Sequence, residues 1–178
     1  MTSKIVPFNA EIEVLIEFLT KNTWSFHGTS KQKAENIRRS YETGYYMSEE
    51  ARTFWIVNDQ EENVGIIRIY DLEDECPLFD IKIDASNHGK GLGTFTIKWM
   101  LEYVFITLED KKRLEGHTRE DNFAMRTVFH KCGFVKEAHH RKAWVSDGVI
   151  YDSIGYGITR EDLETGLITP VNWNDYKY

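Results

Sequence analysis

The residues best suited to do chemistry lie in one glycine-rich turn, whose sequence is His88-Gly89-Lys90-Gly91-Leu92-Gly93-Thr94. The alternate glycines remove side chains from the turn and tolerate positive φ. If a helix begins here, its first backbone N–H groups have no intrahelical partners and carry partial positive charge, so a phosphate or carboxylate can bind them. The turn therefore predicts an anion site, with Lys90 as a nearby charge. A tight turn that binds nothing is the alternative.

The spacing of these glycines excludes two familiar phosphate-binding motifs. A P-loop requires Gly-x-x-x-x-Gly-Lys-Ser/Thr, and no pair of residues here supplies it. A dinucleotide fingerprint requires Gly-x-Gly-x-x-Gly, but Thr94 stands where its third glycine belongs. Nucleotide binding of these two types is therefore disfavoured.

The elements that must position the turn follow from the hydrophobic pattern on either side of it. Residues 78–84 alternate strictly, which predicts a half-exposed strand. Its apolar face holds Phe79, Ile81 and Ile83, and its polar face holds Asp80, Lys82 and Asp84. After the turn, apolar residues recur at three- and four-residue spacing through residue 105, which predicts a helix that faces the core. The unit is a strand, a glycine turn and a helix.

The rest of the chain alternates between helical and extended patterns. Helical spacing predicts helices over residues 11–19, 31–41 and 122–132, the last one capped by Gly133. Extended patterns predict a hairpin over residues 53–57 and 64–70, a strand over 113–118, and a second hairpin over 136–145 and 149–158. Residues 159–163 predict a last helical turn. This order predicts an α/β protein with a mixed sheet and helices on both faces.

Composition narrows the partners that the chain can have. A length of 178 residues with 41% hydrophobic residues suits one globular domain, which we expect to span residues 1–178. The formal net charge of -7 argues against nucleic acid and anionic membranes and fits a cationic or amine partner. Cys76 and Cys132 give neither a disulfide framework nor a metal pair. With no apolar stretch long enough for a signal or a membrane span, we expect a cytoplasmic protein.

A second segment, residues 122–134, completes a pattern with the glycine turn. Its side chains fit Asn-x-Ala-x-x-x-Leu-Tyr-x-Lys-x-Gly-Phe at Asn122, Ala124, Val128, Phe129, Lys131, Gly133 and Phe134. In this order and spacing, the two segments resemble the GNAT acyltransferase superfamily over residues 53–158. The family's loop, Gln/Arg-x-x-Gly-x-Gly/Ala, has its last two glycines at Gly91 and Gly93, with His88 in place of the usual Arg or Gln.

The resemblance implies a GNAT-like fold, with a mixed and mostly antiparallel sheet of about seven strands flanked by helices. It implies acetyl-CoA as cosubstrate, with its pyrophosphate on the glycine turn and its pantetheine arm on the backbone of Ile81 and Ile83. Asn122 is expected to contact the cofactor, although an Asn that opens a helix is also an ordinary N-cap. The cofactor-binding residues implied in this way are Ile81, Ile83, His88, Gly89, Lys90, Gly91, Leu92, Gly93, Thr94, Asn122, Phe129 and Lys131.

Acetyl transfer to an amine requires a neutral nucleophile, a stabilised oxyanion and a proton for the departing thiolate. The resemblance suggests backbone N–H groups of the strand ending at Ile83 for the oxyanion. Candidate bases are Asp80 and Asp84 on that strand, and Glu115 and His117 on the next. As a residue type, His has the most suitable ordinary pKa. Each acidic residue can alternatively be a solvated part of its strand.

The proton donor to the thiolate has no obvious candidate in the sequence. Many relatives use Tyr, but the corresponding Phe129 has no proton to donate. Tyr151, a water or the departing substrate proton can take this role, or the thiolate can leave unprotonated. Neither cysteine stands where a covalent intermediate is indicated, so direct transfer in a ternary complex is expected.

The acceptor is expected to be a small-molecule amine or a peptide N-terminus. Residues 122–134 and 156–163 are similar to the branch that contains ribosomal-protein N-terminal acetyltransferases and many small-amine acetyltransferases. The aromatic loop residues Trp24, Phe26 and His27 are candidates for the mouth of the acceptor site. Trp24 and Phe26 can equally cap the core.

Other features leave alternatives open. His139 and His140 are adjacent, but neighbouring strand residues point to opposite faces and nothing completes a ligand set, so no metal is expected. A homodimer is an expectation from the resemblance only. Because His88 and Phe129 depart from the family pattern, a catalytically silent acyl-CoA-binding module is an alternative. A partner-binding domain with an empty turn is another.

Overall fold

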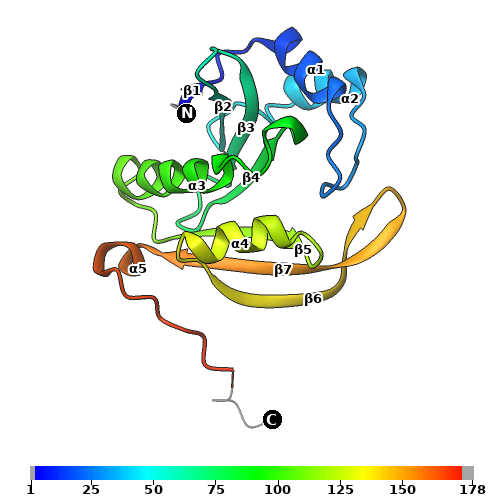
Figure 1. Ribbon diagram of the computed structural model, residues 1–178. Helices are drawn as coiled ribbons and strands as arrows, with labels where there is room; N and C mark the ends of the chain where they lie inside the picture. The colour runs from blue at the N-terminus through cyan, green and yellow to red at the C-terminus, as the bar shows by residue number, and fades with distance from the viewer. Residues whose placement is uncertain (1–2, 174–178) are drawn as a thin grey trace.

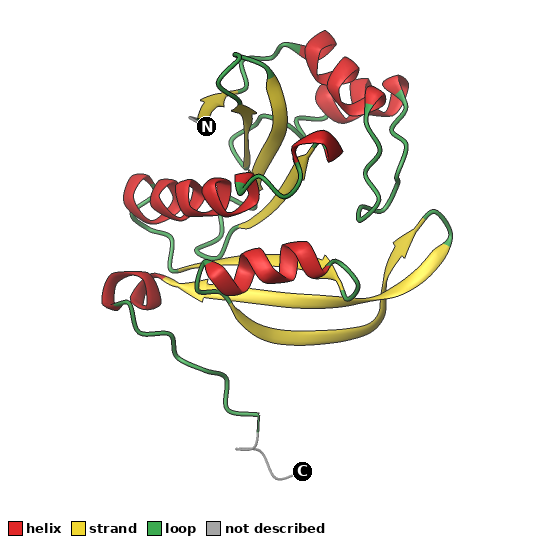
Figure 2. Cartoon of the chain, viewed as in Figure 1, coloured by secondary structure: helices red, strands yellow, loops and turns green. Residues whose placement is uncertain are grey.

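The chain is built on one mixed sheet of seven strands with helices on both faces, as seen in the computed structural model, which describes residues 3–173 (Figure 1; Figure 2). The strand order across the sheet is β1-β2-β3-β4-β5-β7-β6. The strands are β1 (Lys4–Pro7), β2 (Ala51–Val57), β3 (Asn63–Tyr70), β4 (Leu78–Ile83), β5 (Arg113–Arg119), β6 (Val135–Ser146) and β7 (Val149–Thr159). The helices are α1 (Ile12–Lys21), α2 (Ala34–Glu42), α3 (Leu92–Glu102), α4 (Phe123–Lys131) and α5 (Arg160–Thr165).

The sheet is divided into two halves between β4 and β5. All other neighbouring strands are antiparallel, whereas β4 and β5 are parallel and pair only at Leu78 and Glu115. Past this single pair the two strands diverge, and Figure 1 shows β1–β4 with α3 as one half and β5–β7 with α4 as the other. The glycine turn leaves the end of β4 at the edge of this divergence.

Two apolar clusters cover opposite faces of the sheet, and one of them joins its two halves. Because alternate strand residues face opposite sides, β2 directs Phe54 into the cluster beneath α3 and α4 and Trp55 into the cluster beneath α1 and α2. The first cluster also contains Leu114 of β5 and Met100 of α3, so it joins both halves of the sheet. The opposite face of β5–β7 carries polar side chains, among them Arg113.

Most predicted elements are confirmed, with shifts of a few residues at their ends. On β4, Phe79, Ile81 and Ile83 pack in the cluster beneath α3 and α4, whereas Asp80 and Lys82 face the other side, as the alternation predicts. The mixed seven-stranded sheet flanked by helices is that of the expected fold.

Three features of the fold differ from the sequence-based expectation. The strand β1 was not predicted, because four residues are too short to show a period. The helix expected over residues 31–41 begins only at Ala34. The helix expected through residue 105 ends at Glu102 and continues as a π-helical turn, Tyr103–Thr107. The apolar spacing runs unbroken across that change, so it could not reveal it. No helix of the described part of the chain is long and apolar enough to cross a membrane.

Candidate active site

The glycine turn opens onto the first turn of α3. Gly91 is the N-cap residue of α3, with φ of +82°, and Gly89 has φ of +75°, so both occupy the left-handed region that favours glycine. Phe95 donates the first helical hydrogen bond to the carbonyl of Gly91, at 3.0 Å. The N–H groups of Leu92, Gly93 and Thr94 precede that bond and thus need partners from outside the helix.

Space at the turn is open where an anion would approach. A Cβ added to Gly89 or Gly91 would meet no atom within 4 Å. Gly93 differs, because a Cβ there would lie 3.2 Å from Cγ2 of Val128 on α4. Gly89 and Gly91 therefore keep the N–H groups accessible, while Gly93 also lets α3 and α4 approach closely.

Polar side chains hold the turn in shape. His88 donates from Nε2 to the carbonyl oxygen of Ile83, at 2.9 Å, which directs its imidazole back to the end of β4. Asp84 accepts the backbone N–H of Asn87 at 2.9 Å, and Lys90 donates from Nζ to Oδ1 of Asn87 at 2.9 Å. Asp84, one of the sequence-predicted bases, thus stabilises the turn. Lys90 is exposed beside it.

The predicted cofactor residues on β4 lie along the divergence of the sheet. Ile81 and Ile83 pair with Ile67 and Gly65 of β3. In the part of the chain that is described, no residue of β5 pairs with β4 beyond Leu78. The backbone edge of β4 that faces β5 is therefore directed into the gap between the halves, as a strand-like ligand arm requires.

Two residues of the downstream motif, residues 122–134, cap or pack helix α4. Asn122 caps α4, accepting the N–H of Met125 at 3.2 Å and donating to Oγ1 of Thr118 at 3.0 Å. Phe129 is 1% exposed, and its ring stacks on Tyr156 with centroids 4.5 Å apart. Lys131 is exposed in the last turn of α4. Phe129 thus contributes apolar surface and no proton.

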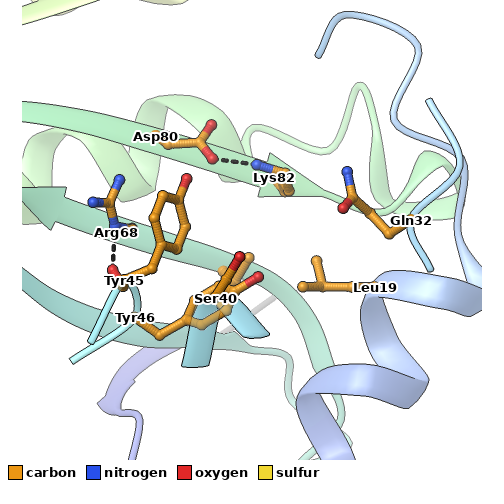
Figure 3. A pocket seen from close by; sticks show the side chains of 9 residues that line it. Leu19, Gln32, Ser40, Tyr45, Tyr46, Arg68, Asp80 and Lys82 are labelled. Atoms are coloured by element: carbon orange, nitrogen blue, oxygen red, sulfur yellow. Dashed lines mark hydrogen bonds and ion pairs between the residues drawn. The ribbon is translucent and has the colours of Figure 1, made fainter. Parts of the chain in front are cut away.

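On the opposite side of β4, two cavities of about 260 Å³ and about 320 Å³ share part of their walls. We call them together the polar cleft. The shared wall residues are Gln32, Tyr45, Arg68, Asp80 and Lys82. The first cavity, drawn in Figure 3, is further lined by Leu19, Ser40, Tyr46 and Ile66. The second is further lined by His27, Gly28, Thr29, Tyr70, Phe79, His117 and Trp144.

Asp80 forms a charged network at the centre of the polar cleft. One carboxylate oxygen is 3.1 Å from Nε2 of His27, and the other is bonded to Nζ of Lys82 (Figure 3). Burial favours a higher pKa, but the charge of Lys82 and the contact with His27 hold the pKa of Asp80 well below its ordinary value. Asp80 is therefore ionised at neutral pH and is a weak proton acceptor.

His117 and Glu115 form a second pair at the edge of the polar cleft. Nε2 of His117 is 2.8 Å from Oε1 of Glu115, and Oε2 of the same carboxylate accepts a bond from Arg113 at 2.8 Å. Burial favours a higher pKa for Glu115, but the bonds from His117 and Arg113 hold its pKa below the ordinary value. The ionised carboxylate therefore fixes Nε2 as the donor and leaves Nδ1 as the acceptor. Gly155 carries no side chain beside this nitrogen, since a Cβ there would lie 3.4 Å from Nδ1.

The loop between α1 and α2 is fastened across the cleft by the β6–β7 hairpin. Ser146 donates to the carbonyl of His27 at 2.6 Å, and Asp147 donates its N–H to the carbonyl of Gly28 at 3.3 Å. Of the three loop residues predicted for the acceptor, His27 lines the cleft. Trp24 is 3% exposed in the core and donates its indole N–H to Leu19 at 2.9 Å, which favours the core alternative.

Phe26 and Tyr151 lie together at the side of this loop. The guanidinium of Arg119 stacks 3.5 Å from the ring of Tyr151 and 5.2 Å from that of Phe26, and it donates to the carbonyl of Ser25 at 2.8 Å. Neither aromatic residue is part of the cleft wall. Of the residues that were candidates for chemistry, the structure therefore brings Asp80, His27 and His117 to one cavity and leaves Tyr151 outside.

Sequence reasoning missed several residues of the polar cleft, among them Arg68, Lys82 and Tyr45. Arg68 is the single charge in the apolar strand Val-Gly-Ile-Ile-Arg-Ile-Tyr, which is a signal that could have singled it out. Lys82 follows the same alternation as Asp80 but reads as a solvated strand residue. Tyr45 comes from an irregular segment with no periodic signal.

Comparison with known proteins identifies the family of the chain. The sequence model of the family described as Acetyltransferase (GNAT) domain matches residues 4–135. The SPbeta prophage-derived uncharacterized N-acetyltransferase YokL of Bacillus subtilis (strain 168) is 27% identical over 135 residues, or 75% of this chain and 75% of that protein.

Solved structures share the fold at low sequence identity. Mutant forms of the spermidine/spermine N-acetyltransferase SpeG from Vibrio cholerae match with a TM-score of 0.75 and 16% identity, over 93% of this chain and 99% of that chain. The spermidine N-acetyltransferase from Vibrio cholerae in complex with CoA and spermine matches with a TM-score of 0.75 and 19% identity, over 89% of this chain and 96% of that chain. Since the family model spans well over half of the sequence, the chain belongs to the GNAT acetyltransferase family.

Proposed function

We propose that this acetyltransferase moves an acetyl group from acetyl-CoA directly to the primary amine of a small molecule or a peptide N-terminus. The observation that carries the proposal is the divergence of β4 and β5 past Leu78, between the glycine turn on one side and the polar cleft on the other. Phe79, at the point of divergence, already lines the cleft. A thioester bound along the gap can therefore meet an amine from the cleft.

The residues of the glycine turn fit the cofactor. The pyrophosphate would bind the N–H groups at the start of α3, where Gly89 and Gly91 leave open space, with Lys90 as a neighbouring charge. The pantetheine arm would bond to the free backbone edge of β4 near Ile81 and Ile83. When bound, the cosubstrate supplies the acetyl group as a thioester. In this role His88 shapes the turn through its bond to β4 rather than replacing the usual Arg or Gln.

We assign the base to His117, positioned by Glu115. The neutral amine attacks the thioester carbon, so that a C–N bond forms, the C–S bond breaks and the thiolate leaves. His117 accepts the proton of the amine at Nδ1, directly or through a water, while Glu115 holds the opposite nitrogen. Asp80 is better suited to orient His27 and Lys82 than to accept a proton, because its pKa is held low.

The thiolate receives no proton from position 129, because Phe129 is buried and lacks a hydroxyl. Tyr151 lies on Arg119 outside the cleft, so a water or the proton released by the amine is the better source. A covalent route through Cys132 is disfavoured, because burial raises the pKa of its thiol and thiolate is the reactive form.

Calorimetry and a transfer assay test the proposal. The purified chain should bind CoA, Gly91→Trp should abolish that binding by filling the open space, and Gly166→Trp should retain it. Gly166 is the matched control, because it too has positive φ and open space but lies at the end of α5. Free-thiol release across a panel of amines, including the spermidine and spermine of the solved relatives, should then reveal acetyl transfer. Absence of CoA binding would refute the proposal, and binding without transfer would indicate a silent module.

The assembly state and the cytoplasmic location also belong to this proposal. We propose a homodimer in the cytoplasm, following the family resemblance. Light scattering of the purified chain with and without CoA tests the first part, and a mass equal to one chain would contradict it.

A further inference from the structure

Arg68 of β3 is held in the polar cleft by aromatic rings and by no carboxylate. Its guanidinium lies 3.6 Å from the ring centroid of Tyr45 and 4.1 Å from that of Tyr70. Its Nε donates to the carbonyl of Tyr45 at 2.5 Å (Figure 3). Within residues 3–173, no acidic side chain forms an ion pair with it. The terminal nitrogens of the guanidinium are thus fixed in orientation but unpaired, which is the geometry that binds a carboxylate or phosphate through two parallel bonds.

The carboxylate on the neighbouring strand forms no ion pair with Arg68. Asp80 is its cross-strand partner, yet both carboxylate oxygens are taken by His27 and Lys82. The polar cleft therefore contains the cations Arg68 and Lys82 against the single carboxylate of Asp80. This local excess of positive charge runs against the net charge of -7 of the chain. It is a property of the cleft and not of the composition.

One buried donor of a cleft residue has no partner in the region that the structure describes. The indole Nε1 of Trp144 is buried, and it has no hydrogen-bond partner among the residues described. An indole nitrogen can only donate, so it requires an acceptor. A buried donor without a partner is costly unless a ligand or water satisfies it. The geometry of Arg68, beside the ammonium of Lys82, suits a ligand with acceptor oxygens.

We infer that the acceptor amine carries an anionic group, a carboxylate or a phosphate, which binds Arg68 while the amine faces His117. This inference rests on the proposed acetyl transfer and specifies its substrate class. A polyamine has only cations to place beside Arg68 and Lys82, where like charges repel. Amino acids and phosphorylated amines therefore fit the cleft better than polyamines.

Matched acceptors of similar size test the charge requirement. The first set is 4-aminobutyrate, butylamine and 1,4-diaminobutane, which differ in carrying a carboxylate, no second group or a second ammonium. The second pair is 2-aminoethyl phosphate and ethanolamine. With acetyl-CoA as donor, we expect kcat/KM for the anionic member of a set to exceed that of its partners by roughly 10- to 100-fold. The anionic compound with the higher kcat/KM shows whether the group that Arg68 binds is a carboxylate or a phosphate.

Substitutions of Arg68 test where the preference originates. Arg68→Gln should remove the preference mainly through KM, and Arg68→Lys, which keeps charge but loses the planar fork, should retain part of it. Arg39→Gln removes an equal charge from the exposed face of α2 and should retain all of it. Thermal unfolding of each variant checks that the loop held by Arg68 is still folded. If Arg68→Gln unfolds, Arg68→Lys decides the question.

The inference and the proposed function fail in different ways. Equal or faster acetylation of butylamine and 1,4-diaminobutane would overturn the inference while leaving acetyl transfer intact. A preference that survives in Arg68→Gln would overturn it as well. If no amine is acetylated, calorimetry of the same compounds with the CoA-saturated chain measures the preference directly, and equal binding of all members overturns the inference. Absence of CoA binding refutes the proposed function alone.

Discussion

Replacing Gly91 with Ala separates the anion-binding role of the glycine turn from its contribution to stability. Gly91 has φ of +82°, and a Cβ there meets no atom within 4 Å, so the folded state has no clash to relieve. The structural cost is therefore only that of a left-handed backbone for an L-residue, about 1–2 kcal/mol. For a domain of this size that corresponds to a fall in Tm of roughly 2–8 °C.

The expected effect of Gly91→Ala on CoA binding is larger. The added methyl group projects into the space that an anion needs to reach the N–H groups at the start of α3. Loss of one charge-assisted hydrogen bond weakens binding by about 1.5–3 kcal/mol, so Kd for CoA should rise roughly 10- to 100-fold. Gly148→Ala is the matched control, because Gly148 also has φ of +82° and open space but lies in the β6–β7 turn.

Isothermal titration with CoA and thermal unfolding measure the two effects on the same samples. The Tm should fall by a similar amount in both variants, while the affinity for CoA should fall only in Gly91→Ala. An unchanged Kd in Gly91→Ala would show that the turn is structural. An equal loss of affinity in Gly148→Ala would show that backbone strain, and not access to the N–H groups, weakens binding.

Three further predictions follow from the site and the fold. His117→Gln should lower kcat/KM by roughly 10²- to 10⁴-fold with Kd for CoA unchanged, and Glu115→Gln should lower it less. His139→Gln, an exposed histidine of β6, should have no effect, and a full rate in His117→Gln would exclude the assigned base. Because the folded-state pKa of Asp80 is lowered, its stabilisation is present above the ordinary value of about 4 and is lost as pH falls further. Urea unfolding should therefore show Asp80→Asn less stable than the parent at pH 7, with a gap that narrows below about pH 4; a gap independent of pH would contradict the assigned charge state. Thr159→Ala removes the side-chain cap of α5, whose Oγ1 accepts the N–H of Asp162 at 3.1 Å. It should cost about 1 kcal/mol in urea unfolding and leave acetyl transfer unchanged, and no loss of stability would show that α5 does not depend on its cap.

Local sequence was sufficient for the features that depend on backbone and spacing. The turn at Gly89 and Gly91 could be predicted because positive φ and an exposed helix start require glycine there. The alternation of residues 78–84 is enough by itself to predict that Asp80 and Ile81 lie on opposite faces of the strand. The family, the mixed sheet and most of the order of elements follow from signals of this local kind, whereas the four-residue strand β1 does not.

Only the tertiary structure decided which side chains share the polar cleft. Tyr45 follows α2, Arg68 lies on β3 and Lys82 on β4, so they meet only after antiparallel pairing and the packing of α2 against the sheet. Long-range packing likewise placed Trp24 in the core. Residue type and period fix which face a side chain takes, but not which distant partner lies opposite. The sequence therefore determined the family and the glycine turn, and the fold alone determined the charge of the polar cleft.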